Sequence, residues 1–379
     1  SRATSLDDLP RYDRAAAHRV WQATLGPAAD LLDGVSHLFV VPDGPLQSIP
    51  FAMLLTAAHD GEFTDAPWLM RRYATTTLPA ASTLRALRAV ARPTQAAQAF
   101  LGVGDPVLTG PPGAARGGTR GQQTGLRAAL RSAPPQLSRI FTRNGLADVR
   151  SVRELTPLPE TADELRAVAR ALGAGGDALV LGRNATEQRI RTMDLSRYRV
   201  ISFATHGLTA GEVPGFAEPG LVLTPPERAT PEDDGILGVS TIARLRLDAD
   251  MVILSACNTA APDGSPGAEA LSGLARAFLY AGARSLLASH WPVESQSAVR
   301  ITTGLFAAQQ AEATIGRAEA LRRAQLAYVA AATRPMQAHP LLWAPFVLVG
   351  EGGRPIAVVA PAAEEAAGDE PVSEGEDSP

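Results

Sequence analysis

The sequence has 379 residues, of which 45% are hydrophobic, and its formal net charge is −4. Such a small charge argues against a nucleic-acid-binding protein of the strongly basic kind, so no direct nucleic-acid partner is expected. The single cysteine excludes an intramolecular disulfide framework and fits a reducing cytoplasm, which is the expected location. No apolar run is long enough to span a membrane, and we expect no membrane partner.

The length allows two domains, or one large domain with appendages. We expect an N-terminal α/β subdomain at residues 1–96, with a helical start and strands at His37–Val41 and Arg72–Leu78. These pieces are too few for an independent core, so the subdomain should pack on the residues that follow. Because the chain begins with Ser1 rather than methionine, the sequence leaves open whether it is a fragment of a longer protein.

A larger domain is expected at residues 97–355, beginning with a strand at Ala99–Val103. The segment Val107–Pro135 is rich in Gly, Pro and Arg and has no acidic residue. We expect residues 107–135 to be a flexible basic insertion. Two interpretations remain open for it: a solvated loop without a task, or a segment that gates the site or is cut by the protein itself.

Regular alternation of helices and strands begins near residue 157. Thr161 and Glu164 have the spacing of a capping box and predict a helix through Leu172. Asn184, with an acidic residue three positions later, predicts the start of a second helix. The last strand is expected at Trp343–Val349. A tail at residues 356–379 should be disordered, because its acidic, apolar-poor composition cannot offset the entropy of ordering.

Two matched units, each a strand followed by a reactive side chain, carry the chemistry of the larger domain. Met251–Asn258 reads M-V-I-L-S-A-C-N, an apolar run without alternation that is typical of a strand buried on both faces, followed by Cys257. Val200–Gly207 repeats the arrangement and ends in His206. Parallel neighbouring strands would bring His206 and Cys257 to one edge, where ligands bind in open parallel sheets. An imidazole there would favour the thiolate.

A simpler interpretation exists for each residue taken separately. A lone buried cysteine is most often a small apolar filler, and a histidine at a strand end often only satisfies a backbone carbonyl. The paired arrangement favours the functional interpretation. Metal binding is disfavoured because one cysteine and six scattered histidines offer no usual ligand spacing, and we expect no metal or other cofactor.

Several motifs together resemble the CHAT-domain family. The active-site motifs are A-T-H-G at Ala204–Gly207 and S-A-C-N-T at Ser255–Thr259. Further matches are the segments Val41–Phe51, Gly267–Arg284, Ser289–Val293 and His339–Gly350. The family is similar to separases, gingipains and caspases. The resemblance therefore implies a three-layer α/β/α caspase-like sandwich around a mostly parallel sheet, in addition to the N-terminal α/β subdomain.

The same resemblance implies a function, a cysteine endopeptidase that cleaves protein substrates with a His206–Cys257 dyad. The oxyanion would be held by the backbone N–H groups of Gly207 and Cys257, although Gly207 fits a plain turn equally well. The family also suggests tetratricopeptide repeats or a regulatory protein as a partner on the N-terminal side. Two other classes stay open: a catalytically silent CHAT-like interaction scaffold, and a thiol acyltransferase.

Three acidic residues near the dyad are candidates for substrate binding: Asp263, Glu269 and Glu294. Separases resemble this chain in having a tryptophan-containing strand end followed by an acid that lines the specificity site, and the matching position here is Glu294. A carboxylate there would favour arginine or lysine before the scissile bond. Aspartate specificity is not implied, because the nucleophile motif departs from that of caspases. The alternative is that Glu294 only caps a helix.

Overall fold

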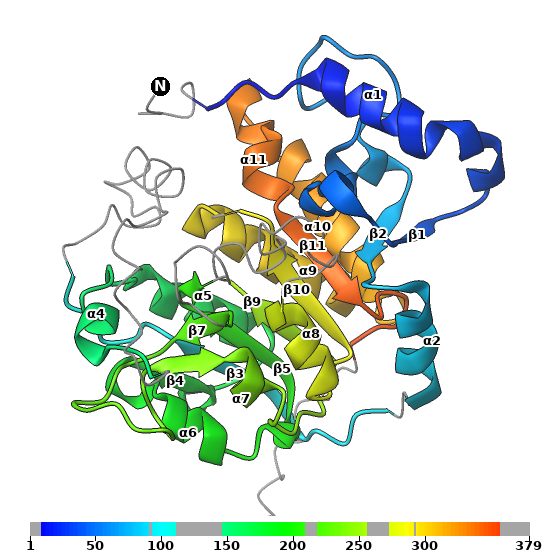
Figure 1. Ribbon diagram of the computed structural model, residues 1–379. Helices are drawn as coiled ribbons and strands as arrows, with labels where there is room; N and C mark the ends of the chain where they lie inside the picture. Colours follow the sequence, from blue (N-terminus) through cyan, green and yellow to red (C-terminus); the bar gives the residue numbers. More distant parts are fainter. Residues whose placement is uncertain are drawn as a thin grey trace, which may run out of the picture.

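One eight-stranded sheet runs through the computed structural model, which describes residues 9–90, 93–110, 146–208, 218–255, 273–291 and 293–356 (Figure 1). From one edge to the other its strands are β1 (His37–Val40), β2 (Ala74–Thr77), β11 (Phe346–Gly350), β10 (Ser285–Ser289), β9 (Met251–Leu254), β5 (Tyr198–Ala204), β3 (Gln98–Gly104) and β4 (Leu179–Leu181). All neighbouring pairs are parallel except β10 with β11.

Helices cover both faces of this sheet and make two separate cores. One core contains side chains of α5 (Glu160–Ala171), α9 (Ser295–Ala311) and α10 (Arg317–Ala330). The other contains side chains of α6 (Glu187–Thr192), α7 (Val239–Ile242) and α8 (Gly273–Tyr280). The predicted α/β/α sandwich around a mostly parallel sheet is therefore confirmed. The remaining helices are α1 (Arg14–Thr24), α2 (Ala81–Val90), α4 (Val149–Arg153) and α11 (Pro340–Trp343).

The apolar run of β9 explains why this strand sits at the centre. Met251 and Ile253 belong to the core on the α5, α9 and α10 face, whereas Val252 and Leu254 belong to the core on the α8 face. All four are at most 1% exposed. Burial of each such side chain contributes about 1.5–3 kcal/mol. A strand with two buried faces needs a continuous apolar run rather than an alternating one.

The first 96 residues complete one edge of the same sheet. They supply β1 and β2, and β2 pairs with β11 from the far end of the chain. A smaller core of Trp21, Phe51, Leu54, Leu69 and Tyr73 lies in this region. This region therefore packs on the rest of the chain partly through the hydrogen bonds of the sheet. The domain boundary at residue 96 stays a prediction.

A second, three-stranded sheet follows His206 directly. It consists of β6 (Gly207–Leu208), β7 (Gly220–Val222) and β8 (Ile236–Gly238), all antiparallel. Its side chains Leu208, Val222 and Ile236 share a small core with Val152 of α4. This sheet was not predicted from the sequence, because two- and three-residue strands carry too little periodicity.

Three local predictions were wrong. The helix α6 is capped by Thr186, whose hydroxyl accepts from the Arg189 N–H, and does not start at Asn184, which lies in the preceding turn. The helix α5 begins before Thr161, with Pro159 as its N-cap, and the Thr161 hydroxyl donates to the Leu158 carbonyl instead of capping the helix. Pro159 adopts a helical φ and ψ, which lets the helix start earlier than the capping-box spacing indicates. The third error concerns Trp343, which ends α11 rather than starting a strand, because Pro340 preorganises a helical turn at its first position.

A buried ion pair lies at the amino end of β9. Arg317, whose side chain is 1% exposed, places its guanidinium 2.8 Å from a carboxylate oxygen of Asp250. The same guanidinium donates to the carbonyls of Glu351 and Pro355, and these hydrogen bonds hold the last described residues against α10.

None of the described helices is both long and apolar enough to cross a membrane. The predicted disorder of the acidic tail lies almost entirely outside the described residues.

Candidate active site

The two strands that lead to the predicted dyad are neighbours and parallel. Val200 pairs with Met251 and Phe203 with Leu254, and the Ser255 N–H donates to the Phe203 carbonyl at 2.9 Å. Their carboxyl ends therefore stop at the same level of the sheet, as predicted. Cys257 follows two residues after Ser255 and lies outside the described residues, so its role stays a prediction.

The His206 ring is oriented by a backbone carbonyl. Its Nε2 atom lies 2.7 Å from the Thr156 oxygen. A carbonyl oxygen only accepts hydrogen bonds, so Nε2 carries the proton in the neutral ring and Nδ1 is the basic nitrogen. A fixed tautomer of this kind is what a general base needs, because the nitrogen that takes a proton is defined before the substrate binds.

The segment that carries Thr156 is itself held in place. Pro157 restricts Thr156 to extended conformations, and α4 lies just before it, with Asp148 accepting from the Arg150 N–H as the helix cap. Arg153 donates from Nη2 to the Pro226 carbonyl at 2.8 Å. The sequence analysis missed Thr156, because a backbone acceptor leaves no residue signature; Pro157 is the one local sign.

Gly207 is the first residue of β6 and pairs with Leu221 of β7. The carbonyl of the preceding residue, His206, accepts from the Val222 N–H at 2.9 Å. The small sheet thus fixes the backbone on the carboxyl side of the histidine. The oxyanion role of the Gly207 N–H stays a prediction.

The comparisons with known proteins bear on this edge of the sheet. A family model described as CHAT domain matches residues 14–351, which is most of the chain. The chain belongs to the CHAT domain family. This membership confirms the resemblance drawn from A-T-H-G and S-A-C-N-T, and places both motifs inside the matched region.

The similarity of this CHAT domain to individual known proteins is low. Tetratricopeptide repeat protein 28 of Mus musculus is 26% identical over 228 residues, covering 51% of this chain and 9% of its own length. The Arg-specific cysteine proteinase gingipain R matches with a TM-score of 0.42 at 9% identity, over 91% of this chain and 68% of its own. The Saccharomyces cerevisiae separase in complex with securin matches with a TM-score of 0.44 at 12% identity, over 83% and 15%.

Glu294 lies at the junction between β10 and α9, and its two carboxylate oxygens have different surroundings. One oxygen, Oε2, accepts from the Ser297 N–H at 2.7 Å and from the Ser297 hydroxyl at 2.9 Å, so Glu294 is the N-cap of α9. The other oxygen, Oε1, is buried and makes no hydrogen bond within the described part of the chain. The capping interpretation is therefore correct, and it uses only half of the carboxylate.

The two other acidic candidates, Asp263 and Glu269, lie outside the described residues. A residue that the sequence analysis did not single out, His290, stands at the end of β10 beside this connection. Burial lowers the pKa of His290 to about 4, and its buried Nδ1 atom has no hydrogen-bond partner in the part of the chain that the structure describes. His290 is therefore neutral wherever the protein works near neutral pH.

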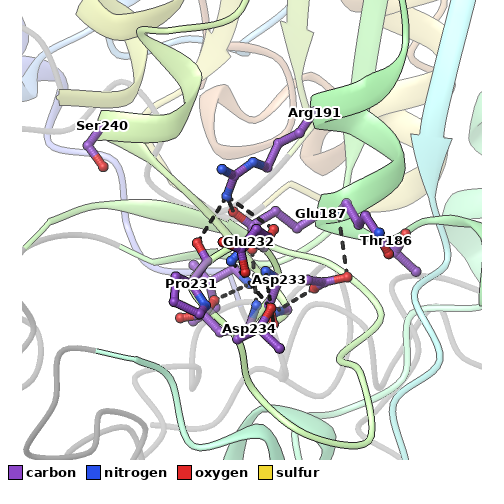
Figure 2. A network of polar contacts seen from close by, with 12 residues as sticks. Thr186, Glu187, Arg191, Pro231, Glu232, Asp233, Asp234 and Ser240 are labelled. Carbon is purple, nitrogen blue, oxygen red and sulfur yellow. Dashed lines mark hydrogen bonds and ion pairs between the residues drawn. The ribbon is translucent and has the colours of Figure 1, made fainter.

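A polar network fixes the turn between β7 and β8, as Figure 2 shows. Arg191 of α6 donates to the carbonyls of Pro231 and Glu232, and Glu187 accepts from the Asp234 N–H at 3.1 Å. The Asp234 carboxylate in turn accepts from the Ala147 N–H at 2.8 Å. The turn thus connects α6 to the segment that runs through α4 toward Thr156.

We expect Glu187→Gln to stabilise the protein above neutral pH. Burial raises the pKa of Glu187 from 4.5 to about 7, and its side chain is 5% exposed. The folded chain therefore binds this proton more tightly than the unfolded chain, and the free energy of unfolding falls as pH rises from 4.5 to 7. Over this pH range the free energy of unfolding falls by about 3 kcal/mol.

Urea unfolding at two pH values checks this expectation. The difference in unfolding free energy between Glu187→Gln and the parent should grow from near zero at the acidic end to about 2–3 kcal/mol above neutral pH. Glutamine keeps an oxygen that accepts from the Asp234 N–H, so the turn should hold. A constant difference at both pH values would contradict the assigned shift.

Proposed function

We propose that this CHAT domain is a cysteine endopeptidase in which His206 and Cys257 form the catalytic dyad. The observation that carries the proposal is the parallel, in-register pairing of β5 with β9, together with a His206 tautomer fixed by the Thr156 carbonyl. Membership of the CHAT domain family supports the same assignment. Residues that lie outside the described part, above all Cys257, enter by their place in the sequence.

In the proposed reaction His206 takes the thiol proton and the Cys257 sulfur attacks the peptide carbonyl carbon, forming a carbon–sulfur bond. The oxyanion accepts hydrogen bonds from the backbone N–H groups of Gly207 and Cys257. Collapse of the tetrahedral intermediate breaks the carbon–nitrogen bond, and the amine leaves with the proton held by His206. Water, deprotonated by His206, then hydrolyses the thioester and restores the thiol.

The substrate preference that the site supports best is a basic residue before the scissile bond. Among the described residues the buried Oε1 atom of Glu294 has no hydrogen-bond partner, which is costly unless a ligand supplies a donor. An arginine guanidinium offers donors in a geometry that matches a carboxylate. Asp263 and Glu269, which follow the nucleophile closely in sequence, are proposed as further contacts in the same region.

We expect Glu294→Gln to reduce the preference for arginine over citrulline, which has the same shape without the charge. Glutamine keeps an oxygen to accept from the Ser297 N–H, so α9 stays capped while the charge is lost. The ratio of kcat/KM for the two peptides should fall at least about tenfold. Efficient cleavage after aspartate, or an unchanged ratio, would show that the side chain is recognised elsewhere.

Two alternative functions share parts of this geometry. A silent scaffold needs only the fold and no reactive thiol. The fixed His206 tautomer favours the enzyme, because a scaffold has no use for a defined basic nitrogen. A thiol acyltransferase would use the same dyad but pass the acyl group to an acceptor other than water. An N-terminal regulatory partner also belongs to the proposal, since the mouse relative is named a tetratricopeptide repeat protein and is far longer than this chain.

A peptide-library cleavage assay tests the proposed function. The parent protein should cut a subset of peptides, and Cys257→Ala should cut none. Cleavage that needs an added acyl acceptor would favour the transferase. A parent protein and a Cys257→Ala variant that are equally inert would favour the scaffold.

A further inference from the structure

The short helix α11 lies between two parts of the chain that are far apart in sequence. The first is the N-terminal strap, defined here as Leu9–Asp13, which enters beside α11 in Figure 1 and whose Leu9 is 7% exposed. The second is the β10–α9 connection, defined as the described residues His290, Trp291, Val293 and Glu294. The helix touches both through hydrogen bonds.

His339 makes the contact to the strap. Its Nδ1 atom accepts from the Leu341 N–H at 3.1 Å, so it caps α11. A ring nitrogen that accepts carries no proton, so Nε2 carries the proton and donates to the Pro10 carbonyl at 3.0 Å. His339 is 3% exposed, and burial lowers its pKa to about 4, so this neutral tautomer persists at neutral pH.

The other side of α11 holds the β10–α9 connection. The Trp291 indole N–H donates to the Leu341 carbonyl at 3.0 Å. The His290 N–H donates to the Pro345 carbonyl, also at 3.0 Å. The backbone of Leu341 thus makes both contacts. Its N–H donates to His339 Nδ1, and its carbonyl accepts from the Trp291 indole N–H. Glu294 stands three residues beyond Trp291, and its buried Oε1 finds no hydrogen-bond partner among the described residues.

We infer that His339 is a positioning residue for substrate recognition: it ties α11 to the N-terminal strap and thereby fixes the β10–α9 connection that presents Glu294. A histidine that only filled the core would need a single partner, whereas the two ring nitrogens of His339 hydrogen-bond both the N-terminus of α11 and the strap. The inference rests on the proposed function, in which Glu294 receives the basic side chain of the substrate.

The strap is anchored well enough to serve as a fixed support. The Tyr12 hydroxyl donates to the Met53 carbonyl. The Tyr12 ring packs edge-on against Trp68, with ring centres 5.5 Å apart, and Trp68 in turn packs against Trp343 of α11 at 5.3 Å. Phe63 packs edge-on against the His339 ring at 5.0 Å. The strap, the aromatic cluster and α11 therefore form one contiguous packed unit.

His339→Asn separates the two bonds of His339. Asparagine is among the best N-cap residues, so it keeps the bond from the Leu341 N–H, but it is too short to replace the bond to Pro10. His339→Ala removes both bonds. A matched control is His18→Ala, because the His18 ring also bonds a backbone carbonyl of the N-terminal region, that of Leu55 at 3.0 Å.

Two readouts test the inference. Hydrogen–deuterium exchange of the peptide covering the β10–α9 connection should quicken about two- to tenfold in His339→Asn, as expected for one lost hydrogen bond, and further in His339→Ala. The preference for arginine over citrulline should fall by a similar factor through a raised KM, with kcat little changed. His18→Ala should alter neither quantity.

The outcomes separate this inference from the proposed function. If no peptide is cut by the parent protein, the proposed function fails, while the exchange experiment still tests the positioning of the connection. Unchanged exchange in both His339 variants would overturn the inference. So would faster exchange with an unaltered preference for arginine, or a loss of kcat alone.

Discussion

His206→Asn is expected to lower kcat/KM for a cleaved peptide about 100- to 10,000-fold, the usual contribution of a general acid–base. Asparagine is too short to reach the Thr156 carbonyl, so the hydrogen bond of Nε2 is lost as well. It cannot take the proton from Cys257 or return one to the leaving amine. The effect should therefore appear in kcat, while the free energy of unfolding should fall by only about 1 kcal/mol for the one lost hydrogen bond.

Steady-state kinetics and urea unfolding on the same preparations check this prediction. His59→Asn is the matched control, since the His59 ring bonds only the nearby Glu62 carbonyl in a surface loop. The control should keep the activity of the parent protein. A His206→Asn variant that turns over substrate within a factor of about ten of the parent would show that proton transfer runs through another group.

Arg317→Ala is expected to destabilise the fold by about 3–5 kcal/mol, the usual cost of removing one partner of a buried pair. The substitution leaves the Asp250 carboxylate, itself 4% exposed, without its 2.8 Å partner. It also removes the donors to the carbonyls of Glu351 and Pro355. Because Asp250 directly precedes β9, the loss falls on the strand that leads to Cys257.

Urea unfolding of three variants distinguishes a buried pair from a general effect of removing arginine. Arg323→Ala lies on the same helix, and its exposed ion pairs with Glu312 and Glu319 should matter little. The double variant Arg317→Ala/Asp250→Ala should lose clearly less than the two single losses combined, because each single substitution already removes the same ion pair. Strict additivity would contradict the pairing.

The centre of the sheet was predictable because its strands are buried on both faces. Such strands must be apolar throughout, and Met251–Leu254 has that pattern in four consecutive residues. The placement of His206 followed from the same logic, since parallel neighbours end at one edge. The start of α5 was less predictable, because Pro159 sets it through φ rather than through a side-chain cap.

The parts of the site that escaped the sequence analysis are those made by backbone groups and distant packing. The Thr156 carbonyl is a backbone acceptor, so the identity of residue 156 says nothing about it. The bond from His339 to the Pro10 carbonyl joins residues 329 positions apart in the chain. The different surroundings of the two Glu294 oxygens could not be assigned without the structure, because the sequence allowed both a helix-start role and a substrate contact.

The pH dependence of Cys257 alkylation tests the central claim most directly, because this is the only cysteine in the chain and labelling reports on it alone. A free thiol, with a pKa near 8.5, is less than about 1% thiolate at pH 6. We predict that iodoacetamide labels the parent protein at pH 6 at least about tenfold faster than His206→Asn, whose profile should move toward that of a free thiol. Identical profiles in the two proteins would contradict a His206–Cys257 dyad.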